Sequence, residues 1–205
     1  MLTMEQLFNQ FTFMKSASNL QQCPPDKGIE IAFIGRSNSG KSSAINALVG
    51  RGRLAHTSKT PGRTQLINFF EIEESDRRLV DLPGYGYAKV TERIRQQIEK
   101  MLSEYFSCRT CLHGVVMLMD IRHPLQPADL QMLNLLNETG RHIHVLLTKS
   151  DKLKRGPANA TLLKVRHSLQ HLNNISVQTF SAMKMFGIEE AQDVLCQWFS
   201  FDDED

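Results

Sequence analysis

The stretch Gly35-Arg36-Ser37-Asn38-Ser39-Gly40-Lys41-Ser42 decides how the rest of the chain is interpreted. It has the pattern of a phosphate-binding loop, in which a glycine and four further residues precede Gly-Lys-Ser. The apolar run 29–34 predicts a strand before it, and 43–49 predicts a helix after it. Loop N–H groups and a helix N-terminus then converge on one anion. We expect Lys41 to neutralise the β and γ phosphates and the Ser42 hydroxyl to hold magnesium. The alternative is a glycine-rich turn without a ligand.

The composition is that of an ordinary folded domain. The 205 residues are enough for one domain with a sizeable core. The net charge of +2 is too small to indicate nucleic-acid binding by itself, and we expect no DNA partner. The sequence contains no run of 18 apolar residues and no secretory signal pattern. We therefore predict a cytoplasmic protein without a membrane segment, and separately expect a monomer.

The cysteines allow more than one interpretation. Cys108 and Cys111 have the spacing of half a zinc site or of a redox pair. No second cysteine or histidine pair completes a zinc site, and His113 alone is not enough. We therefore favour free thiols in a reducing compartment for these two and for Cys23 and Cys196.

Apolar periodicity predicts an alternating order of strands and helices. Six strands are expected over 29–34, 65–72, 77–81, 114–120, 144–148 and 175–180. Five helices are expected over 43–49, 91–105, 130–139, 157–172 and 188–198. This order predicts an α/β fold with a six-stranded, mostly parallel sheet, one antiparallel strand, and helices on both faces.

The chain also divides into segments. Residues 1–27 are expected to form an N-terminal extension that packs on the main domain as a short helix or strand. The main domain spans 28–200, and 201–205 is an acidic tail. Residues 51–64 lack apolar periodicity and predict a long loop of the kind that is usually functional or disordered.

Two polar motifs follow predicted strands, at the edge where ligands of parallel sheets bind. In Asp81-Leu82-Pro83-Gly84, the carboxylate can reach magnesium through water, and the glycine can turn its N–H to a γ-phosphate. In Thr148-Lys149-Ser150-Asp151, the Asp151 carboxylate can accept two hydrogen bonds from guanine but not from adenine. The stem of Lys149 can cover the base. The alternative for this second motif is a polar helix start.

A third segment, Phe180-Ser181-Ala182, follows the last predicted strand. Its Ser181-Ala182 peptide can offer a backbone N–H to the guanine carbonyl. The four motifs in this order resemble GTPases of the translation-factor-related class with the Ras-like fold, over about residues 28–200. The segments Thr60–Gln65 (TPGRTQ) and Asp81–Ala88 (DLPGYGYA) are similar to the EngB (YihA/YsxC) family of the TrmE-Era-EngA-YihA-Septin-like class.

The resemblance implies a bacterial GTPase that assists assembly of the large ribosomal subunit and is needed for normal cell division and septation. Its cofactors would be GTP or GDP and magnesium. Magnesium ligands would be Ser42, Thr64 and Asp81, and catalytic residues Lys41, Thr64 and Asn38. The nucleotide would also be approached by Gly62, Arg63, Gln65 and Leu66. The site would be completed by the phosphate loop and by three further segments, Asp81–Gly84, Thr148–Asp151 and Phe180–Ala182.

Two positions depart from the common GTPase pattern. Thr148 stands where asparagine is commoner, which predicts a weaker tether to the phosphate loop. Tyr85 stands where Ras-type enzymes place the water-orienting glutamine, so we predict slow hydrolysis, about 10⁻⁴ to 10⁻² per second. In similar GTPases that lack this glutamine, the equivalent of Asn38 binds potassium. Potassium is thus a candidate cofactor, and a loop-stabilising role of the amide is the alternative.

Two groups of basic residues suggest contact with RNA phosphates. The first comprises Arg51, Arg53, Lys59 and Arg63, and the second Lys149, Lys152, Lys154, Arg155, Lys164 and Arg166. Basic surfaces are also often only solvated, so the expected ribosomal partner rests on the resemblance. The remaining alternatives are a nucleotide-dependent scaffold without useful turnover and a P-loop kinase for a small metabolite.

Overall fold

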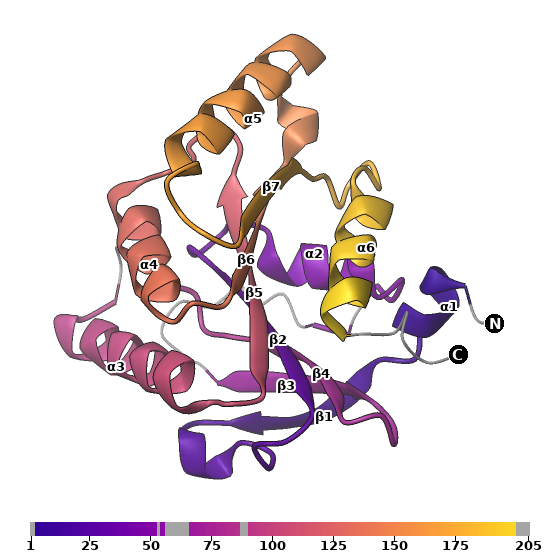
Figure 1. Cartoon of the computed structure of the whole chain (residues 1–205), viewed down its shortest axis with the longest axis vertical. Helices are drawn as coiled ribbons and strands as arrows, with labels where there is room; N and C mark the ends of the chain where they lie inside the picture. The colour runs from indigo at the N-terminus through magenta and orange to yellow at the C-terminus, as the bar shows by residue number, and fades with distance from the viewer. Residues whose placement is uncertain (1–2, 53, 56–65, 87–89, 200–205) are drawn as a thin grey trace.

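The structure, a computed structural model, describes residues 3–52, 54–55, 66–86 and 90–199. One sheet runs through the molecule, with strand order β1-β3-β4-β2-β5-β6-β7 (Figure 1). Its strands are β1 (Thr12–Ala17), β2 (Ile29–Gly35), β3 (Ile67–Ile72), β4 (Arg77–Asp81), β5 (Leu112–Asp120), β6 (His142–Thr148) and β7 (Ile175–Thr179). Strand β3 pairs antiparallel with both β1 and β4, and every other pairing is parallel.

The predicted α/β class with a mostly parallel sheet is therefore confirmed, but the number of strands is seven rather than six. The additional strand, β1, comes from the N-terminal residues and pairs with β3 along the far edge of the hairpin. Only one residue of β1, Ala17, is fully buried, and Phe13 remains 55% exposed while its ring contacts Phe70. A strand with so little buried surface leaves a weak pattern in the sequence.

Helices cover both faces of the sheet, as predicted. They are α1 (Met4–Phe8), α2 (Lys41–Leu48), α3 (Glu92–Cys108), α4 (Pro127–Glu138), α5 (Arg155–Leu169) and α6 (Ile188–Phe199), with the short 3-10 turns η1 (Leu20–Gln22) and η2 (Ser150–Lys152). Helices α1, α2 and α6 share one apolar core, and α3, α4 and α5 share the other (Figure 1). Strand β2 lies between them, with Ile31 and Phe33 in the first core and Ala32 and Ile34 in the second. None of the described helices is long and apolar enough to cross a membrane.

The register of the central strands brings distant polar residues to one edge. Gly35 at the end of β2 is level with Leu118, and Asp81 at the end of β4 is level with Phe33. Asp120 and Thr148 end β5 and β6 as direct partners. The motifs that follow these strands therefore start from the same edge of the sheet, as predicted for the carboxyl ends of parallel strands.

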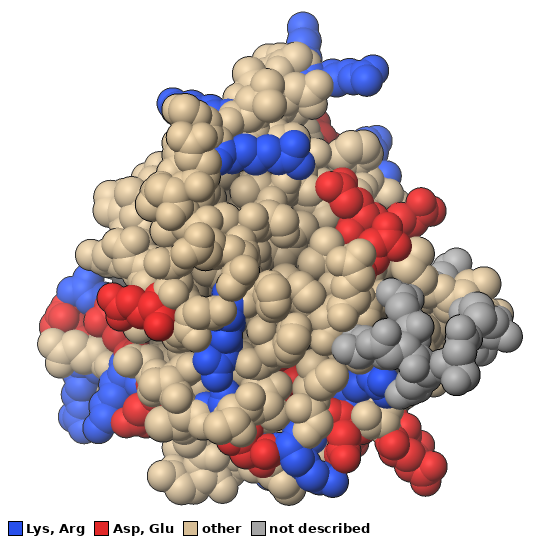
Figure 2. All heavy atoms as spheres, in the orientation of Figure 1, with Lys and Arg blue, Asp and Glu red and all other residues tan. Residues whose placement is uncertain are grey.

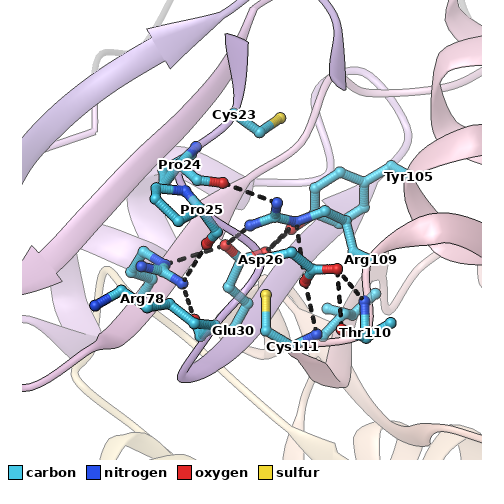
Figure 3. Close-up of polar contacts among 12 residues, drawn as sticks. Cys23, Pro24, Pro25, Asp26, Glu30, Arg78, Tyr105, Arg109, Thr110 and Cys111 are labelled. Atoms are coloured by element: carbon cyan, nitrogen blue, oxygen red, sulfur yellow. Dashed lines mark hydrogen bonds and ion pairs between the residues drawn. The ribbon is translucent and has the colours of Figure 1, made fainter. Parts of the chain in front are cut away.

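At the opposite edge, a buried ionic network fastens the segment that precedes β2 (Figure 3). The Glu30 carboxylate is fully buried and accepts hydrogen bonds from Arg78, Arg109 and the Tyr105 hydroxyl. The same two guanidinium groups also donate to the backbone carbonyls of Pro24, Pro25 and Lys27. Because a buried charge is tolerated only with such partners, this network fixes the N-terminal segment to β2, β4 and the end of α3.

The two cysteines with redox-like spacing lie beside this network. Cys108 is the exposed last residue of α3, and Cys111 is buried. Burial, together with the neighbouring Asp26 carboxylate, raises the pKa of the Cys111 thiol to about 12. Because metal binding and disulfide exchange both require the thiolate, this environment disfavours the zinc and redox interpretations.

His144 in β6 makes folding stability depend on pH. Its ring is 2% exposed, with Nδ1 2.6 Å from Ser176 Oγ and Nε2 2.8 Å from Gln178 Oε1. Burial lowers the pKa of His144, so the folded chain binds fewer protons at this ring than the unfolded chain. In the unfolded chain the ring takes up a proton as the pH falls through its ordinary pKa of about 6.5. This proton uptake favours the unfolded chain, so the free energy of unfolding decreases as the pH falls.

We therefore expect the free energy of unfolding to decrease between pH 7.5 and pH 5.5. In His144→Asn, the free energies of unfolding measured by urea denaturation at the two pH values should differ less than in the wild type. His171→Asn, which removes an exposed ring, is the control. An unchanged pH dependence in His144→Asn would contradict the assignment.

Candidate functional site

The phosphate loop has the conformation that the sequence predicts. Gly40 caps α2 in the left-handed region, with φ of 88°, and the helix begins at Lys41. Gly35 has no room for a side chain, because an added Cβ would lie 2.4 Å from Ser39 Oγ. That Ser39 hydroxyl is buried and has no hydrogen-bond partner among the described residues. A buried polar atom without a partner is expected where a polar ligand completes a site.

The second motif lies directly against this loop. Asp81 is buried at the end of β4, and its carboxylate forms an ion pair with the Lys41 ammonium. Residues 82–85 then continue along β2, because the Leu82 N–H donates to Phe33 O at 3.0 Å and the Tyr85 N–H to Gly35 O at 3.3 Å. The Asp-x-x-Gly motif is therefore held beside the phosphate loop by backbone hydrogen bonds.

Hydroxyl and carboxylate oxygens are the ligands that magnesium prefers. Ser42, in the first turn of α2, and Asp81, paired with the adjacent Lys41, supply both kinds of oxygen at this edge of the sheet. They are the candidate magnesium ligands within the described residues. The third predicted ligand, Thr64, lies outside the described residues together with Gly62, Arg63 and Gln65. Leu66 is described and partly exposed, just before β3.

Thr148 tethers the phosphate loop, through the contact that the sequence predicted to be weaker with threonine than with asparagine. Its hydroxyl lies 2.6 Å from Ser39 O and 3.1 Å from Met119 O, and the side chain is buried. One hydroxyl proton can serve only one carbonyl at a time, but the shorter contact is the one to the loop. The short side chain of a threonine at the end of β6 therefore still reaches the phosphate loop.

Lys149 adds a second tether. It has a left-handed backbone with φ of 57°, and its ammonium donates to Asn38 O at 2.7 Å. The same ammonium lies 3.1 Å from the Asp120 carboxylate. Burial opposes the charge on Asp120, but hydrogen bonds from Arg122 and Lys149 outweigh it and lower the pKa of this carboxyl. Asp120 therefore stays ionised and orients Lys149, a role that the sequence pattern did not indicate.

A pocket of about 670 Å³ opens beside these tethers. Its lining comes from the phosphate loop, α2 and the segments that follow β6 and β7: Gly40, Ser43, Asn46, Ala47, Gly50, Arg51, Gly52, Thr148, Lys149, Asp151, Lys152, Phe180, Ala182, Met183 and Met185. A volume of this size suits a nucleoside or another small ligand. The two motifs predicted to hold guanine therefore line the same pocket as the phosphate loop.

Asp151 is fixed in this pocket by Ser181, whose hydroxyl donates to Asp151 Oδ1 at 2.6 Å. This hydrogen bond lowers the pKa of Asp151, so the carboxylate is an acceptor at neutral pH. Of the Ser181-Ala182 pair, which was predicted to offer a backbone N–H to the base, the Ser181 N–H is engaged, because it donates to Phe186 O at 3.0 Å. The candidate donor is therefore the N–H of Ala182, which lines the pocket.

The structure gives a further reason for asparagine at position 38. Asn38 is exposed and has a positive φ of 65°, a conformation that asparagine tolerates better than most residues. The sequence alone also missed Asn46, whose amide exchanges hydrogen bonds of 2.9 and 2.7 Å with the Ala55 backbone. This pair fastens part of the loop after α2 to the helix.

The fold and the arrangement of the site define a P-loop GTPase. Comparison with known proteins agrees, because residues 30–149 match the family model described as 50S ribosome-binding GTPase. A probable GTP-binding protein EngB from Methylobacillus flagellatus is 53% identical over 200 residues, which is 97% of this chain and 96% of that protein. One from Azoarcus sp. is 53% identical over 194 residues, 94% of this chain and 92% of that protein. The chain belongs to the EngB family of GTP-binding proteins.

Solved structures support the same fold. A crystal structure of a probable GTP-binding protein EngB has a TM-score of 0.67 and 21% identity, covering 83% of this chain and 98% of that one. The crystal structure of an Aquifex aeolicus Era variant bound to GDP and AlF4⁻ has a TM-score of 0.64 and 18% identity, covering 82% and 56%. At these identities the likeness concerns the fold alone.

Proposed function

We propose that this protein is a slow GTPase switch that acts in assembly of the large ribosomal subunit in the cytoplasm and is thereby needed for cell division and septation. The observation that carries the nucleotide part is the position of the phosphate loop between two motifs. Asp81 pairs with its Lys41, and the Ser181-bound Asp151 lines the pocket that Gly40 of the loop also lines. The ribosomal part is supported by the family description and by the relatives' family, not by a contact.

Within the proposal, the residues of this chain have distinct roles. Lys41 would exchange its pairing with Asp81 for the β and γ phosphates, leaving the carboxylate to face magnesium through water. Bound magnesium would neutralise charge on the phosphates, held by Ser42 and, in the GTP state, by Thr64. Asp151 would accept both N–H groups of the guanine edge. Gly84 would sense the γ-phosphate through its N–H.

Hydrolysis is proposed to be slow because no glutamine stands beside Gly84. Tyr85, which occupies that position, is 5% exposed, and its hydroxyl donates to Asp129 at 2.7 Å. A side chain held in this way is not available to orient an attacking water. We expect intrinsic turnover on the scale of unassisted GTPases, about 10⁻⁴ to 10⁻² per second.

The Asn38 amide is proposed as a potassium ligand that partly compensates for the absent glutamine. Potassium should then accelerate GTP hydrolysis relative to sodium at equal ionic strength, and Asn38→Ala should abolish the difference. Asn38→Asp, which keeps a side-chain oxygen and can adopt the same backbone conformation, is the matched variant. Equal wild-type rates in the two salts would exclude this role and leave Asn38 a backbone-shaping residue.

The basic surface around α5 is the proposed contact with ribosomal RNA. Lys154, Arg155 and Lys164 are exposed, and lysine and arginine side chains project from the end of the molecule where α5 lies (Figures 1 and 2). The other members of the predicted cluster are partly engaged, since Lys149 pairs with Asp120 and Arg166 donates to Val177 O. Within the described residues, the proposed RNA contact therefore centres on Lys154, Arg155 and Lys164. Arg53, Lys59 and Arg63 of the first basic group lie outside the described residues.

The test is co-sedimentation with ribosomal subunits in the presence of GDP or a non-hydrolysable GTP analogue. Association that depends on the GTP analogue, and that weakens with salt and in the Lys154→Glu/Arg155→Glu variant, is the expected result. Binding that is equal in both nucleotide states would contradict the switch. Guanine-nucleotide binding without measurable turnover would instead support the scaffold alternative.

A further inference from the structure

The Asp129 carboxylate, which holds the Tyr85 hydroxyl, also joins three segments that are far apart in the sequence. It is fully buried at the start of α4. Its Oδ1 accepts the Tyr85 hydroxyl at 2.7 Å and Arg36 Nε at 3.2 Å, and its Oδ2 accepts the Gln126 N–H at 2.9 Å. A carboxylate removed from water needs such partners, so the three contacts hold one another in place.

Both side-chain partners lie in the proposed nucleotide site. Arg36 is the second residue of the phosphate loop, and its guanidinium also donates to His123 O at 3.0 Å. Tyr85 follows Gly84, and the Ser37 N–H donates to Tyr85 O at 3.2 Å. Burial, followed by the adjacent Asp129 charge, raises the pKa of Tyr85, so its hydroxyl remains a donor at neutral pH.

The backbone around Gly84 is thereby fixed on both sides. Before it, Leu82 is hydrogen-bonded to β2, and after it Tyr85 is bonded to the phosphate loop through its backbone and to Asp129 through its side chain. Gly86 lies against Arg36 and Ala128 at ordinary van der Waals distance, since an added Cβ would lie 3.4 Å from Arg36 Cγ and 3.5 Å from Ala128 Cβ. Little freedom is left for the peptide that carries the Gly84 N–H.

We propose that Asp129 and Tyr85 are positioning residues for the Gly84 N–H, so that the preference between GTP and GDP depends on a carboxylate that does not touch the nucleotide. This rests on the proposed binding of GTP and GDP at the site. GDP has no γ-phosphate, so loosening Gly84 should weaken the binding of GTP more than that of GDP. If the two residues had a purely structural role, their loss would weaken the binding of both nucleotides equally or would change neither.

Tyr85→Phe removes only the hydroxyl, and Tyr105→Phe is its matched control. Tyr105 is also buried and donates to a buried carboxylate, Glu30, at the same 2.7 Å, but at the opposite edge of the sheet. Both variants should lower the melting temperature by roughly 3–8 °C. Titration calorimetry with GDP and a non-hydrolysable GTP analogue should show the affinity for the analogue relative to GDP falling about three- to tenfold in Tyr85→Phe alone.

A second variant tests the carboxylate itself. Asp129→Asn keeps an oxygen for the Tyr85 hydroxyl but removes the charge that holds Arg36. It should lower the same ratio, the affinity for the GTP analogue relative to GDP. In the double variant Tyr85→Phe/Asp129→Asn, this ratio should fall by less than the product of the two single-variant reductions. The proposal would be overturned if the two reductions multiplied, or if Tyr85→Phe and Tyr105→Phe had the same ratio. Failure of the wild type to bind guanine nucleotides would instead refute the proposed function.

Discussion

Asp151→Asn is expected to reduce GDP and GTP affinity by about 100-fold or more and to create affinity for xanthosine nucleotides. Guanine presents two adjacent N–H donors, and the Ser181 hydroxyl holds Asp151 as an acceptor. An amide replaces one acceptor with an N–H donor, which then faces the guanine amine. Xanthine has a carbonyl where guanine has that amine, so the amide and xanthine are complementary.

Competition between labelled GDP and unlabelled GDP, xanthosine diphosphate and ADP measures this switch. Lys152→Ala is the control, because Lys152 lies 3.5 Å from the Asp151 carboxylate but is exposed. We expect that control to change affinity by no more than about fivefold. If Asp151→Asn retained GDP affinity within threefold, Asp151 would not be the residue that recognises the base.

Glu30→Ala should destabilise the fold by about 3–5 kcal/mol, because it leaves the buried Arg78 guanidinium without a counter-charge and the Arg109 guanidinium with only Asp26, 3.9 Å away. Their side chains are 2% and 6% exposed, so solvent cannot replace the carboxylate. Removing one partner of such a network costs more than the net contribution of the network when it is intact.

Urea denaturation monitored by circular dichroism is the measurement. Glu104→Ala, which breaks the exposed pair with Lys100 at 3.8 Å, should cost no more than about 0.5 kcal/mol. Glu30→Gln keeps an acceptor oxygen, so its loss in the free energy of unfolding should lie between those of Glu30→Ala and Glu104→Ala. This variant remains measurable if Glu30→Ala does not fold. A loss below 1 kcal/mol in Glu30→Ala would show that the network does not hold the N-terminal segment.

The sequence predicts well those parts of the site that are formed by consecutive residues. The phosphate loop, its strand and its helix follow from local spacing. The helix expected from residue 91 also begins there, because the Thr91 hydroxyl caps α3 by accepting from Ile94 N. Asp81 and Asp151 could be placed at one edge because strand ends in a parallel sheet share that edge.

What the sequence could not give depends on residues brought together only by folding. The Thr148 tether spans 109 residues, and the contact between Arg36 and Asp129 spans 93. Asp129 is the third residue of α4, and its side chain caps the helix by accepting from the Gln126 backbone. In the sequence, this local role is enough to explain an aspartate at position 129. Its connection to Tyr85 becomes visible only in three dimensions.

Strand β1 has a consequence for how the chain behaves at high concentration. Without it, β3 would be the outermost strand and would present its backbone N–H and C=O groups to other molecules, a surface that promotes aggregation. β1 covers that edge, and its own register shifts between Phe13 and Lys15, which interrupts the regular pairing that another strand would need. The N-terminal strand therefore protects the sheet against edge-to-edge association.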